Sequence, residues 1–117
     1  MKNLKCIYKE NPGSPYKDVF VEGRCRVFLI WGAGETLTAV DNTSPQVKFY
    51  NTVNGAATGT DLRLQLTDTA NYAGTFYGSH WCVDLPQNGI LFDDGLWVEF
   101  PAAGFGISVL VSGGKEA

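Results

Sequence analysis

The sequence of 117 residues contains little charge, and basic side chains are missing from most of its second half. Lys, Arg, Asp and Glu together make 18% of the chain, and the formal net charge is −3. Between residues 64 and 114 there are five acids and no Lys or Arg. Binding to nucleic-acid phosphates needs a basic surface, so we expect no nucleic-acid partner.

The few basic residues are concentrated at the start of the chain. Residues 1–26 hold six basic groups and three acids, a local charge of 6 − 3 = +3. A basic front and an acidic back suit subunits that meet head to tail, or an arm that lies on an acidic neighbour. Chance segregation of the charges is the alternative.

Disulfide and targeting signals are also missing. Cys6, Cys25 and Cys82 are an odd number without a CxxC pair, which argues against a disulfide framework and fits a reducing compartment. The longest apolar run near the N-terminus is Cys6 to Tyr8, too short for a signal peptide, and nothing approaches the roughly 18 apolar residues of a membrane helix. We expect synthesis in the cytoplasm and no membrane partner.

Helical periodicity is absent, whereas alternation and turn signals are frequent. The 14 glycines and the aromatic residues, with little Lys or Glu, are typical of β-rich chains. We predict about eight short antiparallel strands in an all-β sandwich of jelly-roll type. The expected division is an extended N-terminal arm over 1–16, a domain over 17–112 and a flexible tail over 113–117.

The expected strands differ in how they are buried. Residues 17–31 read as a strand buried on both faces or internal to an assembly, and 47–53 as a strand closed by Asn54-Gly55. Leu62, Leu64 and Leu66 share one core-facing side. The remaining expected strands are 36–40, 76–85, 90–92, 96–100 and 107–111.

One possible catalytic or metal site is SHWCVD. In a strand, His80, Cys82 and Asp84 would point to the same side. Alternate residues lie roughly 7 Å apart, too far for a direct Cys–His hydrogen bond. A metal would need Cys6 or Cys25 as well, and their spacing does not support that. His80 is the only histidine, which excludes a scheme that needs two imidazoles. We expect a half-buried polar face with a core-facing Cys82, and no enzyme, metal or cofactor.

Trp81 and Trp97 raise the possibility of sugar stacking. Trp97 shares the side of its strand with Glu99, opposite Leu96 and Val98, so it could form an outward platform. Aromatic residues at this density are more often found in cores or subunit interfaces. We therefore treat a carbohydrate-binding module as an alternative function.

Asp93 and Asp94 precede Gly95 between two apolar segments. Paired carboxylates can hold a metal, but a histidine or an EF-hand ligand pattern does not accompany them. Asp-Gly between apolar strand halves is a favoured hairpin turn. We expect the two acids to be the corner of a hairpin.

The segment around this turn resembles small virion structural proteins of tailed bacteriophages. Their signature, Gly-Ile-x-Phe-x-x-Gly-Leu-x-Val, falls here on Gly89, Ile90, Phe92, Gly95, Leu96 and Val98. VKFYNTVNGAATGT and the closing ISVLV are also similar, and the resemblance covers roughly residues 24 to 112. The longer N-terminal arm and the longer, more aromatic stretch 67–81 depart from the family pattern.

The resemblance implies a β-sandwich, often trimeric, that decorates a capsid or sits at the head–tail region, and it supplies no catalytic residues. We expect a non-enzymatic capsid decoration or cement subunit, made in the host cytoplasm and found in the virion. Its partners would be copies of itself, as a homotrimer, and the major capsid protein or other virion proteins. A head–tail or tail adaptor is the alternative within this class.

The residues expected to contact partners are aromatic and basic, and most lie in the arm. An arm without function is an equal alternative. The candidates are Lys2, Lys5, Tyr8, Lys9, Tyr16, Trp81 and Trp97.

Overall fold

The computed structural model describes most of the chain, in nine segments. They are residues 4–10, 17–34, 37–38, 46–53, 61–67, 75–76, 81–85, 88–100 and 105–117. Within them lie ten strands and no α-helix. The strands are β1 Lys5–Glu10, β2 Lys17–Gly34, β3 Leu37–Thr38, β4 Gln46–Asn51, β5 Leu62–Thr67, β6 Thr75–Phe76, β7 Trp81–Asp84, β8 Ile90–Phe92, β9 Gly95–Glu99 and β10 Phe105–Glu116.

Eight of these strands form one sheet, in which every pairing is antiparallel. The order is β1-β10-β2-β9-β4-β5, and β7 and β8 also pair with β2. The short strands β3 and β6 form a separate antiparallel pair. The expected all-β antiparallel class is confirmed.

The long strand β2 organises the sheet. Along one edge it pairs with β10, from Val21↔Glu116 to Gly34↔Phe105. Along its other edge it pairs in turn with β9, β8 and β7, which follow one another in reverse chain order. β2 therefore links every part of the large sheet.

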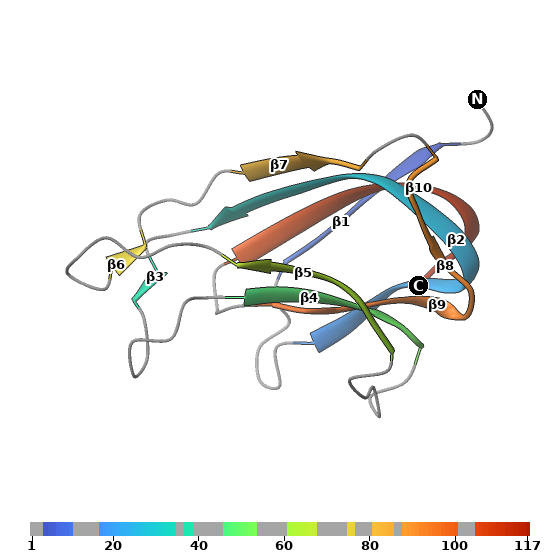
Figure 1. Ribbon diagram of the computed structural model, residues 1–117, viewed down its shortest axis with the longest axis horizontal. Coiled ribbons are helices and arrows are strands. Elements are labelled where there is room, and N and C mark those ends of the chain that lie inside the picture. The colour runs from blue at the N-terminus through green and yellow to red at the C-terminus, as the bar shows by residue number, and fades with distance from the viewer. Residues whose placement is uncertain are drawn as a thin grey trace.

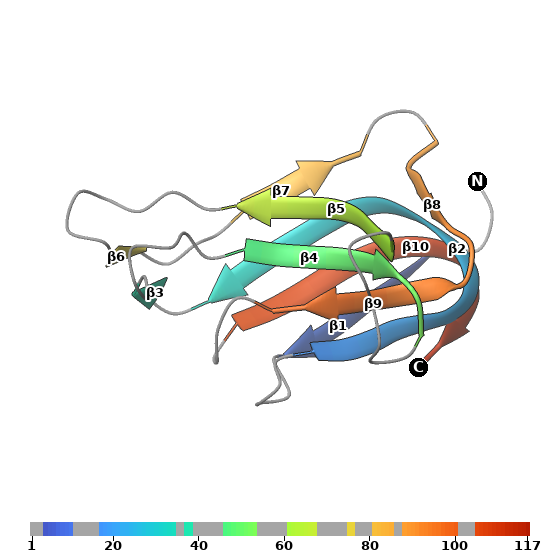
Figure 2. The same ribbon diagram turned by 60° about the horizontal axis from the view of Figure 1, so that its bottom comes forward.

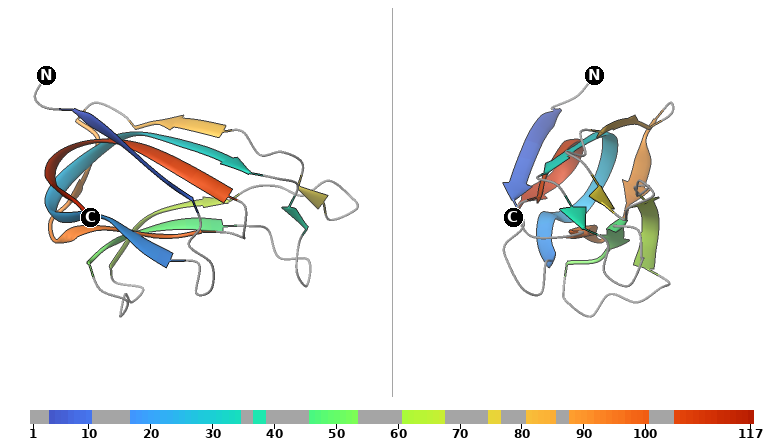
Figure 3. Two further views of the ribbon diagram at one scale, coloured as in Figure 1. Left: turned by 180° about the vertical axis from the view of Figure 1, so that it is seen from behind. Right: turned by 90° about the vertical axis from the view of Figure 1, so that its left-hand side faces the viewer.

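The sheet curls so that its two ends face each other. Figure 1 shows β1, β10, β7 and the C-terminal half of β2 above, and β4, β5, β9 and the start of β2 below. Figure 2 shows β4, β5 and β9 side by side, and Figure 3 shows β1 beside β10 at the outside of the curl. We name the strands above, in the view of Figure 1, the upper layer and the strands below the lower layer.

The space between the layers holds the hydrophobic core. Each layer contributes alternate residues, as a sheet with one buried face requires. The cluster comprises Ile7, Phe20, Val21, Cys25, Val27, Ile30, Val47, Phe49, Leu85, Phe92, Leu96, Val98, Phe100, Ile107, Val109 and Val111. Burial of so many large apolar side chains, at roughly 25 cal/mol per Å², is the main force that holds the layers together.

Several strand predictions are confirmed in position and in orientation. β5 begins at Leu62 as expected, and Leu64 and Leu66 pack against the core. Ile107, Val109 and Val111 are fully buried and alternate with half-exposed residues. β4 and β5 are antiparallel neighbours, as the expected hairpin demands, although Asn54-Gly55 itself lies outside the described residues.

The expected arm and tail need correction. Residues 5–10 are not an arm but strand β1, which pairs along its whole length with β10 and places Ile7 in the core. Residues 113–116 are not a tail, because β10 continues to Glu116 beside β2. The two segments support each other: Lys5 Nζ donates a hydrogen bond to the Gly114 carbonyl oxygen, at 3.2 Å.

Two further predicted strands are described only in part. Within the expected strand 76–85 lie the end of β6 and all of β7, and within the expected strand 36–40 lies β3, Leu37–Thr38. β7 pairs with β2 in the large sheet, whereas β6 pairs with β3. The two described ends of the expected strand 76–85 thus belong to different sheets.

Candidate functional site

The Asp93-Asp94 bend lies at the point where the sheet passes from one layer to the other. β8 before it and β9 after it do not pair with each other; both pair with β2. Phe92 is opposite Cys25 and Gly95 is opposite Glu22, so the chain follows one edge of β2 across the bend. The expected hairpin corner is therefore wrong: the bend is a corner in one edge of a curled sheet.

Two hydrogen bonds fix this corner. The Gly23 N–H donates to the Asp94 carbonyl oxygen at 3.2 Å, which continues the ladder with β2 through the bend. The Asp94 N–H donates to Asn51 Oδ1 at 2.7 Å. Asn51 ends β4 and is 8% exposed. Sequence reasoning missed Asn51, since its role depends on a contact 43 residues away.

Both signature glycines occupy positions that exclude a side chain. Gly95 has φ +151°, and an added Cβ would lie 2.8 Å from the Val21 carbonyl oxygen and against the Val53 side chain. Gly89 has φ +71°, and its Cβ would collide with the Val27 carbonyl oxygen. Positive φ is also found in the neighbouring strands β2 and β10, at Gly23, Gly113 and Gly114. Glycine therefore allows several adjacent strands to bend at this corner.

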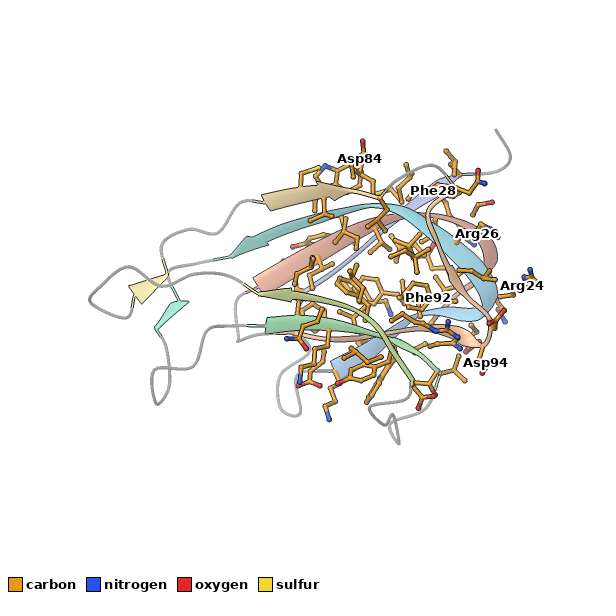
Figure 4. The ribbon with its side chains drawn as sticks, viewed as in Figure 1. Arg24, Arg26, Phe28, Asp84, Phe92 and Asp94 are labelled. Carbon is orange, nitrogen blue, oxygen red and sulfur yellow. The ribbon has the colours of Figure 1, made fainter. Side chains whose placement is uncertain are left out.

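The apolar signature residues fill the core on each side of the corner. Phe92 is 1% exposed, Leu96 and Val98 are 0% exposed, and Ile90 is half-buried against the same cluster. Phe92 points between the layers, whereas Asp94 lies at the outer end of the molecule (Figure 4). Each part of the signature thus has a structural task.

The carboxylates themselves face solvent. Asp93 Oδ2 lies 3.5 Å from Arg63 Nη2, and both side chains are about half exposed, so this ion pair is weak. Within the described residues, His, Cys, Asp and Glu do not gather in groups of three that could hold a metal ion. The geometry of the bend is that of a turn.

The SHWCVD side chains are described only in part. The expected core-facing direction of Cys82 is wrong, because Cys82 is exposed on β7, as is Asp84. His80 lies outside the described residues. Cys25 of β2, by contrast, has its side chain buried in the core. Burial raises the pKa of its thiol from about 9 to about 11, so Cys25 stays protonated and unreactive at neutral pH.

The basic candidates of β1 have partners inside the molecule. Lys9 Nζ lies 3.5 Å from Asp18 Oδ2 and 5.9 Å from the centre of the Phe20 ring. Lys5 is bonded to the β10 backbone, as described above. Tyr8, by contrast, is 58% exposed. Lys2 and Tyr16 lie outside the described residues.

Trp97 points away from the core, as expected, but its ring is covered. Tyr50 of β4 lies beside it, with ring centres 5.6 Å apart, and Lys17 Nζ lies 5.4 Å from its centre. Trp97 is consequently 7% exposed and offers little surface for stacking. Of Trp81 the structure describes the backbone, which pairs with Gly32.

Tyr50 and Glu99 complete this covered surface on the lower layer. The Tyr50 hydroxyl donates to Glu99 Oε1 at 3.2 Å. Burial, and then the Glu99 carboxylate, raise the pKa of Tyr50 above its ordinary value. Glu99 is opposite Lys17 of β2 on one side and opposite Lys48 of β4 on the other. The basic front and the acidic back of the chain thus meet within one sheet, so the charge asymmetry does not require a second subunit.

The upper layer has an open outer face that the sequence analysis did not single out. Tyr8, Ser108, Trp31 and Cys82 stand opposite one another on β1, β10, β2 and β7. Their chain neighbours Ile7, Val109 and Ile30 are buried, so this row points outward. Trp31 is 37% exposed and Cys82 is exposed. We call these four residues the outer row.

Comparison of the chain with protein-family models, curated proteins and solved structures found no match. Across the described segments, no helix has the length and apolar character needed to cross a membrane.

Proposed function

We propose that the chain is a non-enzymatic structural protein of a tailed-phage virion, most specifically a capsid decoration or cement subunit. In this proposal the curled sheet is a β-sandwich of jelly-roll type, and the subunit assembles as a homotrimer on the major capsid protein. It is made in the host cytoplasm and functions in the particle.

The observation that carries the proposal is the structural use of the phage signature. Gly89 and Gly95 occupy backbone positions that exclude side chains, and Phe92, Leu96 and Val98 fill the core beside the corner. A signature made wholly of turn and core residues is what a shared scaffold would retain. The solvent-facing Asp93 and the inert Cys25 thiol support a role without catalysis.

A cement subunit acts through repeated contacts. Each copy needs only a modest interface, because many copies on one shell combine weak contacts into a stable array. A low proportion of charged residues suits a protein that contacts other subunits.

The test is the composition of purified particles of the phage that encodes the chain. Quantitative mass spectrometry should find the chain in copy numbers comparable with the major capsid protein, and particles that lack it should lose their contents at lower temperature. A few copies located at one vertex would indicate a head–tail adaptor instead. Absence from particles would refute the virion role.

A further inference from the structure

The two exposed aromatic residues of the outer row, Tyr8 and Trp31, lie on a face that also carries the carboxylates of Glu10 and Asp84. Tyr8 and Trp31 are separated by Ser108 on the intervening strand, so their Cα atoms are roughly 10 Å apart, two strand spacings. The two aromatic residues therefore flank a small, hydroxyl-bearing residue. Such an arrangement presents two apolar surfaces with a polar group between them.

Tyr8 lies flat on the sheet. A Cβ added at Gly106 would be 2.8 Å from Tyr8 Cε1 and 2.9 Å from Cζ, so the ring covers the position where Gly106 has no side chain. The Tyr8 hydroxyl donates to Glu10 Oε1 at 3.1 Å, which tethers the far end of the ring. One ring face is thus held against the backbone while the residue remains 58% exposed.

The polar groups around the two rings are hydroxyls and carboxylates. Ser108 stands between them, Glu10 holds the Tyr8 hydroxyl, and Asp84 lies exposed one row away on β7. Two basic residues of β1 and β2 have partners inside the molecule: Lys9 is paired with Asp18, and Arg26 Nη1 donates to the Asn88 carbonyl oxygen. This charge pattern is complementary to hydroxyl donors and repels anions.

We propose that the outer row is a binding surface for neutral oligosaccharides, with sugar rings stacked on Tyr8 and Trp31. Pyranose rings present flat C–H faces to aromatic rings and hydroxyl groups at their rims, which the Ser108, Glu10 and Asp84 oxygens meet. The partner is neutral because acidic sugars would meet carboxylates here. This surface is additional to the proposed virion role and does not depend on it.

The inference is tested by native electrophoresis of the full chain through gels that contain hydroxyethyl cellulose, galactomannan or dextran. At least one of these neutral polysaccharides should retard the protein, and alginate, which is anionic, should not. Tyr8→Ala and Trp31→Ala should each weaken binding roughly tenfold, because each removes one stacking surface. Gln65→Ala, an exposed change on the lower layer, serves as the matched control.

A second pair of variants separates stacking from folding. Gly106→Ala lifts the Tyr8 ring without removing an aromatic group, so binding should fall while far-ultraviolet circular dichroism and the urea midpoint show a folded chain. Tyr8→Phe keeps the ring and loses only its tether, so binding should change much less than in Tyr8→Ala. Should Trp31→Ala fail to fold, Tyr8→Ala and Gly106→Ala decide the question.

Several outcomes would overturn the inference. They are an unretarded protein in all three neutral gels, retardation by alginate alone, or equal retardation of the Tyr8→Ala and wild-type chains. Sedimentation that shows an oligomer in which Cys82 is protected from a maleimide would instead make the outer row a subunit interface. Each of these results leaves the mass-spectrometric test of the virion role unaffected.

Discussion

The upper and lower layers each carry a tryptophan on the outer face, but only one of the two is open. Trp97 on the lower layer is 7% exposed beneath Tyr50 and Lys17, whereas Trp31 on the upper layer is 37% exposed beside Ser108. Both side chains point away from the core. The difference lies in the neighbouring strands: large residues cover Trp97, while a small residue leaves Trp31 accessible.

This comparison shows that an outward direction is not enough to make an aromatic residue a binding surface. The pattern LWVEF places Trp97 opposite Leu96 and Val98 correctly, and all three positions agree with the structure. The covering residues come from β2 and β4, far away in sequence. Accessibility is therefore a property of the sheet order and not of the strand.

The largest expected effect is the loss of stability when the covered tryptophan is truncated. Trp97→Ala should lower the free energy of unfolding by about 3 kcal/mol, because it leaves a void beneath Tyr50 and Lys17. Trp31→Ala should cost about 1 kcal/mol, since much of that ring is already in water. Urea unfolding followed by circular dichroism measures both. Equal losses would abolish the distinction between the two faces.

The corner that joins the layers should be the next most sensitive feature. Asn51→Ala removes the acceptor of the Asp94 N–H in a part-buried hydrogen bond and should cost about 1–3 kcal/mol. Asn51→Asp retains an acceptor oxygen at the same position and is the matched control. The measurement is again the urea midpoint. A midpoint unchanged by Asn51→Ala would mean that the corner does not need this bond.

A smaller effect is expected from the core thiol at high pH. The folded chain holds the pKa of Cys25 at about 11, above its value of about 9 in the unfolded chain. The stabilisation of the folded chain by the protonated Cys25 thiol is complete below pH 9. It is lost as pH rises toward 11, because in this range the unfolded state ionises to the thiolate before the folded state does. Stability should therefore fall across this window.

Tyrosine side chains also ionise at high pH, so the measurement compares wild type with Cys25→Ala. The decline should be shallower in the variant. A difference between the two chains that stays constant with pH would show that Cys25 does not carry this dependence.

The smallest expected effect is at the two acids of the bend. Asp93→Asn/Asp94→Asn should change stability by less than about 1 kcal/mol, because the Arg63 ion pair is exposed and the bend is held by backbone groups and Asn51. A larger loss in thermal or urea unfolding would assign the carboxylates a role that this geometry does not give them.

Local patterns predicted the strands that have one polar and one apolar side. Leu64 and Leu66, like Ile107 and Val109, alternate plainly and lie in the core. The sequence of residues 5–10 did not predict a strand, because Ile7 is their one fully buried side chain. Their partner strand β10 lies about a hundred residues further along the chain. A charged edge strand has the same local sequence as a solvated arm.

The candidate site was less predictable, since it depends on pairing between distant strands. Asp-Asp-Gly signals a turn, but whether the flanking strands pair with each other or with β2 is not encoded in those residues. The outward direction of Trp31 could not be predicted from alternation. The β2–β10 register shifts between Leu110 and Val111, and this shift breaks the alternation around Phe28. Asn51 is recognisable only once Asp94 lies beside it.

Acrylamide quenching of two single-tryptophan chains tests the contrast between the layers most directly. Trp81→Phe/Trp97→Phe leaves Trp31 alone, and Trp31→Phe/Trp81→Phe leaves Trp97 alone. Trp31 should emit at longer wavelength and be quenched readily, whereas Trp97 should be shielded until the chain unfolds. Equal quenching in the folded chains, or stronger quenching of Trp97, would contradict the assignment of one closed and one open face.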